Sequence, residues 1–212
     1  MNRKKAINKI SFLAAGISIL MLCSGCNLIE LDKPEPEKTY YSFNAVKNQK
    51  KAFAGKSIPA DLILLQFTAA PEFRGKKFIY KKNNKYIKDY YNRFFSPPEK
   101  MIQTICAKWL NKTGLFKTVS TRSQADSRDY ILKCELLEIY CDITEKKKLC
   151  AIIKTRFTLM KYGAADKVIM EKEIYGTTGF HDFSPDNLIN AWSQSLEEIF
   201  IKLLKVLHQG LL

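Results

Sequence analysis

Short apolar segments separated by turn residues predict strands in the first half of the chain. Residues 40–46 and 61–70 are two such segments, and both are bounded by residues that favour turns. Residues 76–91 predict a hairpin that turns at Asn83-Asn84. Three longer segments of the second half predict further strands, at residues 130–143, 149–163 and 167–180.

Two segments with apolar residues at three- and four-residue spacing predict helices. The first follows Ser96, which we expect to be the N-cap, with Pro97 at the first helical position and Gly114 at the end. The second begins in the same way, with Ser184 as cap and Pro185 behind it. We expect its apolar stripe to lie in the core, and the stripe consists of Leu188, Ile189, Trp192, Leu196, Ile199, Phe200, Leu203 and Leu207.

The first two of the longer strands are joined closely enough to predict another hairpin. A turn centred between residues 145 and 146 sets Arg156 opposite Glu135 on one face, and Phe157 opposite Cys134 on the other. One face is then charged and the other apolar, as register selection requires.

The same register sets Cys141 opposite Cys150, so it predicts a disulfide between them in a non-hydrogen-bonded pair. A bulge in either strand would break the coincidence. Two buried free thiols are the alternative, and the sequence leaves both readings open.

The order of strands, helix, strands and helix predicts an α+β domain. We expect an antiparallel sheet with two main helices packed on one face. No internal repeat is visible in the chain.

The N-terminal residues have the pattern of a bacterial export signal. A basic start without acids precedes an uncharged run from Ile10 to Ile29. The run ends in Ser24-Gly25-Cys26, which resembles a lipobox, in which the cysteine is acylated and becomes the new N-terminus. The predicted organisation is a cleaved signal peptide at 1–25, a lipidated N-terminus and tether at 26–39, and one domain at 40–212. Cys26 is the predicted lipidation site.

Two other readings of this segment stay open. The uncharged run is long enough for an uncleaved membrane helix. Cys23 and Cys26 also form a C-x-x-C pair, although no strand precedes it and no second pair follows. Cys23 stands where lipoboxes usually carry leucine, which is a departure from that pattern. Asn27 after the cysteine favours sorting to the outer membrane.

Charge and composition narrow the function classes. Loss of residues 1–25 would remove four of the 35 basic residues and no acid, so the formal net charge would fall from +14 to +10. This surplus favours anionic surfaces, but the lysines are scattered, and export argues against a nucleic-acid partner. His181 beside Asp182 is the only local hint of catalysis. We find no nucleophile motif, phosphate loop or zinc spacing, and therefore expect no enzyme activity, cofactor or metal.

Aromatic and basic residues alternate between residues 73 and 101. This composition suits a membrane interface, a protein contact or stacked bases. The alternative is that the aromatic side chains only cover the first helix.

The same region carries a family resemblance. Four segments carry it, in this order: PEFRGKKFIY, YIKDYYNRFFSPPEKM, WLNKTGLFKTV and NAWSQSLEEI. Together they resemble the ABC-type transport auxiliary lipoprotein family, which accompanies MCE-type lipid transport systems. The resemblance covers residues 41–207. The departures are Cys23 and the lysine-rich turn near Lys146.

The resemblance implies a non-catalytic outer-membrane lipoprotein that faces the periplasm. Its partners would be membrane lipid at Cys26 and an MCE-type protein with its ABC permease and ATPase, which move phospholipids or other hydrophobic molecules. A homo-oligomer is left open. The candidate partner-contact surface consists of Arg74, Phe78, Tyr80, Tyr86, Tyr91 and Phe94. The rival is an outer-membrane assembly lipoprotein that supports a secretion or lipopolysaccharide-export channel.

Overall fold

The computed structural model describes residues 37–44, 57–121, 129–145, 147–163 and 167–211. The predicted signal peptide, Cys26 and most of the predicted tether lie outside the described residues. The chain divides into two compact units, Met1–Glu37 and Lys38–Leu212.

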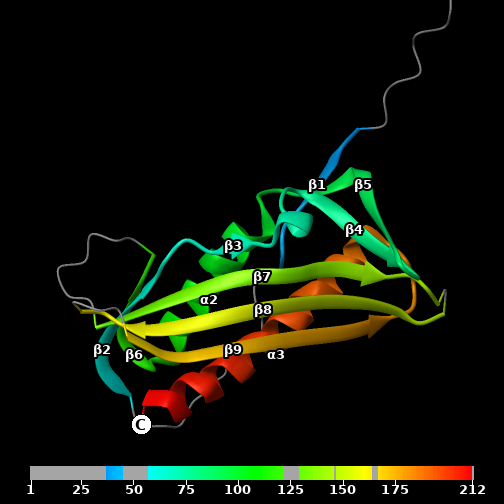
Figure 1. Ribbon diagram of the computed structural model, residues 1–212. Coiled ribbons are helices and arrows are strands. Elements are labelled where there is room, and N and C mark those ends of the chain that lie inside the picture. Colours follow the sequence, from blue (N-terminus) through cyan, green and yellow to red (C-terminus); the bar gives the residue numbers. More distant parts are fainter. Residues whose placement is uncertain (1–36, 45–56, 122–128, 146, 164–166, 212) are drawn as a thin grey trace, which may run out of the picture. The chain divides into compact units, whose positions relative to one another are not determined.

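Three long antiparallel strands form the centre of the second unit (Figure 1). They are β7 (Tyr130–Asp142), β8 (Leu149–Lys161) and β9 (Lys167–Phe180), and β8 lies between the other two. The predicted register is confirmed at Glu135, which pairs with Arg156. Apolar alternation therefore located both the strands and the first half of their pairing.

The other edge of β7 pairs with three short strands in succession, and all three run parallel to it. They are β2 (Ile58–Leu64), β3 (Thr68–Ala69) and β4 (Lys77–Lys82). The sheet is therefore mixed, and the prediction of an antiparallel sheet is wrong in this respect. Side chains alternate identically in parallel and antiparallel strands, so the sequence pattern identified strands but not their directions.

Three further strands complete the sheet. The strand β6 (Phe116–Ser120) pairs in parallel with β2, and β5 (Lys85–Phe94) forms the predicted antiparallel hairpin with β4. At the sheet edge, β1 (Thr39–Tyr41) pairs in parallel with β5. The predicted hairpin turn is confirmed, because Asn83 adopts a left-handed backbone with φ of 53°, which asparagine tolerates better than most residues.

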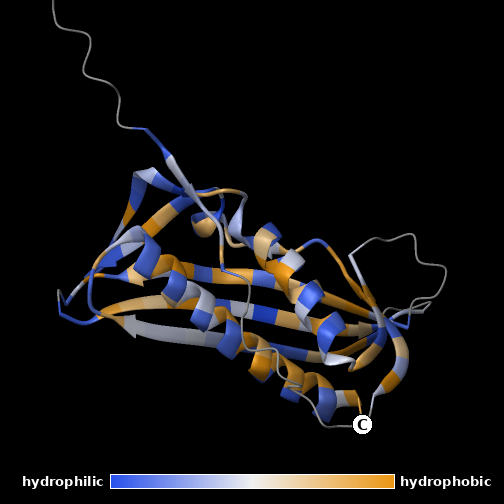
Figure 2. Cartoon of the chain, turned by 180° about the vertical axis from the view of Figure 1, so that it is seen from behind, coloured by the Kyte–Doolittle hydropathy of each residue, from blue (hydrophilic) through white to orange (hydrophobic). Residues whose placement is uncertain are grey.

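Two helices cover one face of the sheet (Figures 1 and 2). They are α2 (Pro98–Thr113) and α3 (Pro185–Leu211), and a short 3-10 helix, η1 (Pro71–Phe73), lies in the loop before β4. The apolar stripe predicted for α3 is buried throughout. Trp109 of α2 packs on Phe200 of α3, with ring centroids 5.6 Å apart.

The helix ends agree with the predictions except at one position. The backbone N–H of Asn187 donates to Ser184 Oγ at 3.1 Å, which confirms the cap of α3. Gly114 ends α2 with φ of 67°, a conformation that glycine adopts without strain. Ser96 is not the cap of α2, because that helix begins one residue later and Pro97 occupies the cap position without a side-chain hydrogen bond.

The helix α3 approaches β9 closely enough to need a glycine. A Cβ on Gly176 would lie 2.2 Å from the carbonyl oxygen of Ser195. On either side of this contact, α3 also satisfies backbone groups of β9: Glu198 accepts from the N–H of Thr177 at 3.3 Å, and Lys202 Nζ donates to the carbonyl of Tyr175 at 2.9 Å. Among the described strands β9 pairs with β8 alone, so this helix covers part of an otherwise open sheet edge.

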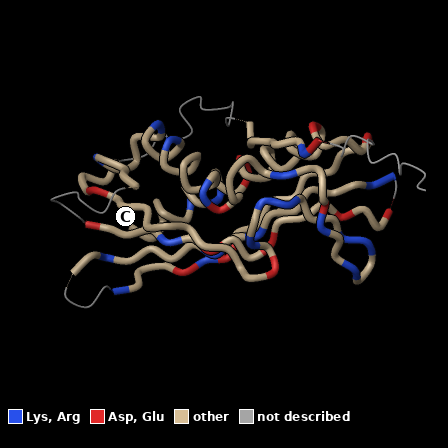
Figure 3. The backbone as a smooth tube through the Cα atoms, turned by 90° about the horizontal axis from the view of Figure 1, so that it is seen from above, with Lys and Arg blue, Asp and Glu red and all other residues tan. Residues whose placement is uncertain are grey.

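The sheet face away from the helices is charged, as the register predicted. Arg156 bridges Glu135 at 3.1 Å and Glu173 at 2.7 Å, and Lys154 also contacts Glu173 at 2.7 Å. Figure 3 shows acidic and basic positions close together along the backbone there. These pairs are more than a third exposed, so each contributes little to stability.

Candidate contact surface at the β4–β5 hairpin

The six residues of the predicted contact surface divide into a buried and an exposed half. Phe78, Tyr80 and Phe94 are buried, and Phe78 packs against Phe94 and Trp192 with centroid separations of 4.7 and 5.1 Å. These three residues belong to the core, and their assignment to a contact surface is wrong. The cause in β4 is that its central residues, Phe78, Ile79 and Tyr80, are buried on both faces of the strand; Phe94 is the buried last residue of β5. The exposed half consists of Arg74, Tyr86 and Tyr91.

A carboxylate organises the surface of β5. The pairing of β4 with β5 is regular from the turn to Ile79 opposite Lys88, and resumes at Lys77 opposite Arg93. Between these points residues 89–92 of β5 form a bulge. Asp89 holds the bulge through four donors: Tyr80 Oη at 2.7 Å, Asn92 Nδ2 at 2.7 Å, and the backbone N–H groups of residues 91 and 92 at 2.8 and 3.1 Å.

These donors also favour the ionised form of the Asp89 carboxyl. Burial alone would raise the pKa of the Asp89 carboxyl, but the hydrogen bonds from Asn92, from Tyr80 and from the backbone outweigh it and hold the pKa below its ordinary value. The pKa of Tyr80 is raised by burial and by its bond to Asp89, so the phenol stays protonated and continues to donate. Asp89 lies in the segment YIKDYYNRFFSPPEKM that carries the family resemblance, but the sequence alone assigned it no role.

The bulge presents Tyr90 and Tyr91 to solvent beside the strand through which the chain enters the domain. Lys38 Nζ lies 5.1 Å from the centroid of the Tyr90 ring, Arg93 Cζ 5.7 Å and Lys77 Nζ 5.9 Å, which are cation–π distances. The Tyr91 ring meets Tyr90 edge to face at 5.1 Å.

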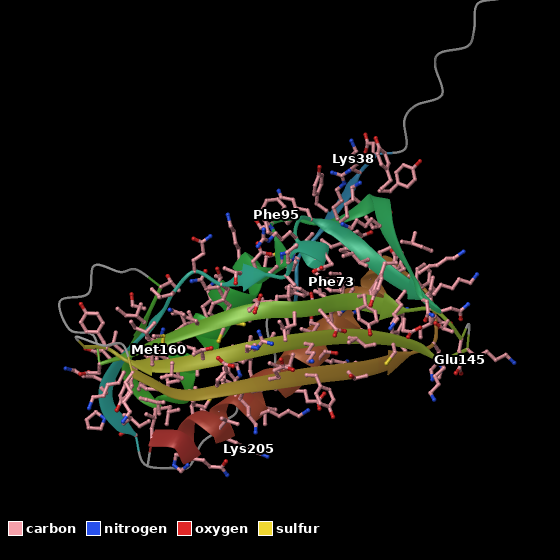
Figure 4. All side chains as sticks on the ribbon, viewed as in Figure 1. Lys38, Phe73, Phe95, Glu145, Met160 and Lys205 are labelled. Carbon is pink, nitrogen blue, oxygen red and sulfur yellow. The ribbon has the colours of Figure 1, made fainter. Side chains whose placement is uncertain are left out.

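We call this surface the Tyr90 patch. It also includes two exposed aromatic residues: Tyr40, which pairs with Arg93, and Phe95, which directly follows the end of β5. Figure 4 labels Lys38 and Phe95, which both lie at the end of the domain that carries β1 and β5. The patch consists of Lys38, Tyr40, Lys77, Tyr90, Tyr91, Arg93 and Phe95.

A groove of about 460 Å³ lies nearer the turn of the hairpin. We call it the Tyr86 groove, and it is lined by Glu72, Phe73, Ile79, Tyr86, Lys88, Leu137 and Glu138. Its aromatic wall is continuous, because Tyr86 meets Phe73 at 6.0 Å and Tyr140 at 5.6 Å, both edge to face. Figure 4 labels Phe73 at the 3-10 helix that forms one border of the groove. Lys81 Nζ lies over both tyrosines, at 5.7 and 5.3 Å.

Tyr140 supports this aromatic wall through its ring contacts with Phe73 and Tyr86. Its side chain is on the sheet face away from the helices, yet it is buried because Phe73 stacks on it at 6.3 Å. Burial, with Glu138 nearby, raises the pKa of Tyr140 to about 12. The groove therefore combines a neutral aromatic wall, the apolar side chains of Ile79 and Leu137, and a charged rim, which is the composition of a protein-contact site.

No family model matches the chain, and no curated protein matches it. Solved structures show its fold. A crystal structure of a Xanthomonas campestris protein, assigned to the family DUF330, is 12% identical and has a TM-score of 0.69 over 81% of this chain and 96% of that one. The chain has the DUF330 fold. An uncharacterized protein is 11% identical and has a TM-score of 0.64 over 81% of this chain and 99% of that one. A hypothetical protein of Chlamydia trachomatis is 6% identical and has a TM-score of 0.51 over 73% of this chain and 98% of that one. At these identities the likeness establishes the fold alone.

The predicted disulfide fails because of a bulge. Between Leu136 and Glu138 the register of β7 with β8 shifts by one residue, so that Cys141 pairs with Ala151, and Asp142 with Cys150. Residues that are one position out of register point to opposite faces of a sheet. Both thiols are free, and burial raises the pKa of each.

The remaining candidate chemistry stays dispersed. His181 and Asp182 are exposed, and the described residues contain no cluster of three or more metal-binding side chains. A second hollow, of about 630 Å³, lies over the charged sheet face and is lined by Arg156, Glu135 and Glu171 among others; Arg156 and Glu135 there already pair with each other. None of the helices within the described ranges is long and apolar enough to cross a membrane.

Proposed function

We propose that the chain is an exported, non-catalytic lipoprotein that is held by acyl chains on Cys26 in the bacterial outer membrane. In this proposal it serves as an auxiliary component of an ABC/MCE-type transporter for phospholipids or other hydrophobic molecules. The observation that carries the proposal is Ser24-Gly25-Cys26 at the end of an uncharged run with a basic start. The resemblance of residues 41–207 to the auxiliary lipoprotein family supports the transport role.

The position of the folded unit supports the anchor. Its first residue, Lys38, follows Cys26 by twelve residues, which span at most about 40 Å when extended. The intervening segment contains Pro34 and Pro36, and prolines favour extended backbone. A domain on such a tether stays close to the bilayer, and the several acyl chains of a bacterial lipoprotein suffice for stable attachment.

The Tyr86 groove is the proposed partner contact. It combines an aromatic wall, an apolar floor and a charged rim in one concave surface, and exposed aromatic residues in such settings dominate binding energies between proteins. Arg74 lies next to Phe73 in sequence and is fixed by a hydrogen bond from Nε to the carbonyl of Ala69 at 3.0 Å. The position of Arg74 suits a charged contact at the border of the groove.

Radioactive palmitate labelling tests the anchor. We expect label in the wild-type protein and its recovery in the outer-membrane fraction, and we expect Cys26→Ala to lose both. The control is Cys23→Ala, which leaves the proposed acceptor in place. Label that persists in Cys26→Ala, or an intact N-terminal peptide in the mature protein, would contradict the proposal.

Co-purification with an MCE-type protein tests the partner contact. We expect Tyr86→Ala and Arg74→Ala to lower recovery of the partner at least tenfold, the loss associated with one contact residue of about 1.4 kcal/mol. Tyr175→Ala is the matched control, because Tyr175 is also exposed and also lies beside a lysine, Lys202, at 4.7 Å. Equal recovery for all variants would exclude the groove as the contact, and equal losses would indicate a nonspecific effect.

A further inference from the structure

We propose that the Tyr90 patch is a second, non-covalent membrane contact that binds the headgroup layer of an anionic bilayer. The inference extends the proposed function, since acylation of Cys26 would place the patch near a membrane. It concerns a different site from the Tyr86 groove, because the groove contains no residue of the patch.

The chemistry of the patch fits a bilayer interface. Tyrosine has an apolar ring and a polar hydroxyl, and it concentrates where hydrocarbon meets water. Four aromatic residues of the patch are exposed, namely Tyr40, Tyr90, Tyr91 and Phe95. Lys38, Lys77 and Arg93 surround Tyr90, so aromatic rings and cations are presented together to the same layer of headgroups.

The positive charge of the patch favours an anionic phospholipid surface as its partner. The carboxylate beneath the patch, Asp89, has both oxygens engaged by neutral donors of the domain itself, so it forms no ion pair with a patch cation through these bonds. The three cations around Tyr90 outnumber this one carboxylate. Basic residues within a Debye length of an anionic leaflet are attracted to it.

The geometry lowers the entropy cost of the membrane contact. The bulge at residues 89–92 fixes the backbone of Tyr90 and Tyr91 through Asp89, so less freedom is lost on binding than for a flexible loop. Lys38 is itself part of the patch and follows Cys26 by twelve residues. The acylated chain would therefore hold the patch within about 40 Å of the bilayer, at a high effective concentration.

Vesicle sedimentation with unacylated protein tests the inference. The protein is the chain from residue 26 to residue 212 with Cys26→Ser, and the vesicles are phosphatidylcholine with or without phosphatidylglycerol. We expect binding only to vesicles with phosphatidylglycerol, and weaker binding as salt is raised. Lys38→Gln/Lys77→Gln/Arg93→Gln should lower partitioning about a hundredfold, because each basic residue near an anionic surface contributes roughly a fivefold factor.

The matched control removes the same charge elsewhere. Lys108, Lys112 and Lys117 are exposed residues of α2 and β6, and their triple glutamine variant should bind nearly as well as the parent. Tyr90→Ala/Tyr91→Ala should bind less than Tyr175→Ala. Circular dichroism verifies that each variant is folded.

Several results would overturn the inference. Equal losses in the two triple variants would show that net charge acts alone, without a localised site. Absence of parent binding to anionic vesicles, or unchanged binding by the patch variants, would exclude a membrane contact. If the patch variants instead lost co-purification with the MCE-type protein while vesicle binding stayed intact, the patch would be a protein contact. Palmitate labelling is independent of all these outcomes, so failure of the inference is distinguishable from failure of the Cys26 anchor.

Discussion

Replacement of Asp89 tests how the surface of β5 is held in shape. Asp89→Ala removes the acceptor of four hydrogen bonds, but the four donors differ in their access to water. Tyr80 is buried, so its hydroxyl is left without a partner, whereas the groups of residues 91 and 92 lie nearer to solvent. A hydrogen bond to a charged group contributes about 1.5–3 kcal/mol, and an orphaned buried donor costs about 1–3 kcal/mol.

These two values describe largely the same bond and are not added. We expect a loss of about 2–3 kcal/mol in the free energy of unfolding, which lowers the melting temperature of a domain of this size by roughly 5–10 °C. Asp89→Asn should lose less than Asp89→Ala, because its carbonyl oxygen still accepts from the backbone of the bulge. Tyr80→Phe should cost about 1 kcal/mol.

Urea unfolding of the single variants and of Tyr80→Phe/Asp89→Ala completes a double-mutant cycle. We expect a coupling energy of about 1 kcal/mol or more between the two side chains, since they are in direct contact. Acidification provides a second measurement. The pKa of Asp89 is lowered in the folded state, so its stabilisation is present above the unfolded pKa of about 4 and is lost as the pH falls through the folded value. The difference between wild type and Asp89→Asn should shrink over that range. Additive losses, or a difference independent of pH, would refute the role of Asp89.

Three other predictions concern packing, thiols and the sheet edge. Gly176→Ala should destabilise the domain by about 1–3 kcal/mol or more in urea unfolding, because its Cβ meets the backbone of Ser195. The control is Gly179→Ala, whose Cβ would lie 3.8 Å from the nearest atom and whose effect should stay within about 0.5 kcal/mol. Equal effects would contradict the close approach. Maleimide should label Cys150 in the native protein faster than the buried Cys106, Cys134 and Cys141. All four thiols should react after unfolding without reductant. If mass spectrometry finds Cys141 and Cys150 unlabelled in unfolded, unreduced protein, the shifted register is contradicted. Glu198→Ala/Lys202→Ala should cost less than about 1 kcal/mol but increase self-association in sedimentation velocity, since it frees two backbone groups at the β9 edge. Unchanged sedimentation would show that these two side chains are not needed to protect the edge.

The sequence predicted those features of the fold that depend on neighbouring residues. Residue spacing identified α2, α3 and the three long strands, and opposite charges at Glu135 and Arg156 identified the register between two of them. The strand directions along the other edge of β7 were missed. They depend on how α2 returns the chain to pair β6 with β2, which is a long-range property that alternation does not contain.

The same distinction applies to the candidate surface. Aromatic and basic composition identified the hairpin, but it did not separate Phe78, which is in the core, from Tyr86, which is not. The separation depends on Trp192 and Phe73, which cover opposite faces of β4 from distant positions in the chain. The bulge at Leu137 gave no clear signal either, because its effect is a shift of one residue within an otherwise regular strand. The bulge in β5 was not predicted either, although Asp89, a turn-favouring residue within a strand, could have indicated it.

The attachment of the chain at β1 shows how a short strand could bear the proposed tether. The strand β1 has three residues, and among the described strands it pairs only with β5, which by itself is a weak connection. The chain continues from it into the core, where Phe43 is buried against Phe94 at 5.3 Å. Asn44 then bonds to α3: its N–H donates to Ser193 Oγ at 3.0 Å, and its side-chain amide donates to Asn190.

A pull on the tether is therefore resisted by the β5 edge, by an aromatic cluster of the core and by α3 together. The Tyr90 patch rests on the same β5 edge through Arg93 and the Asp89 bulge. If Cys26 is acylated and the patch binds headgroups, as proposed, the tether and the patch would therefore act on the same edge of the domain. Loss of that edge should then weaken both attachments together, whereas loss of a groove residue should weaken neither.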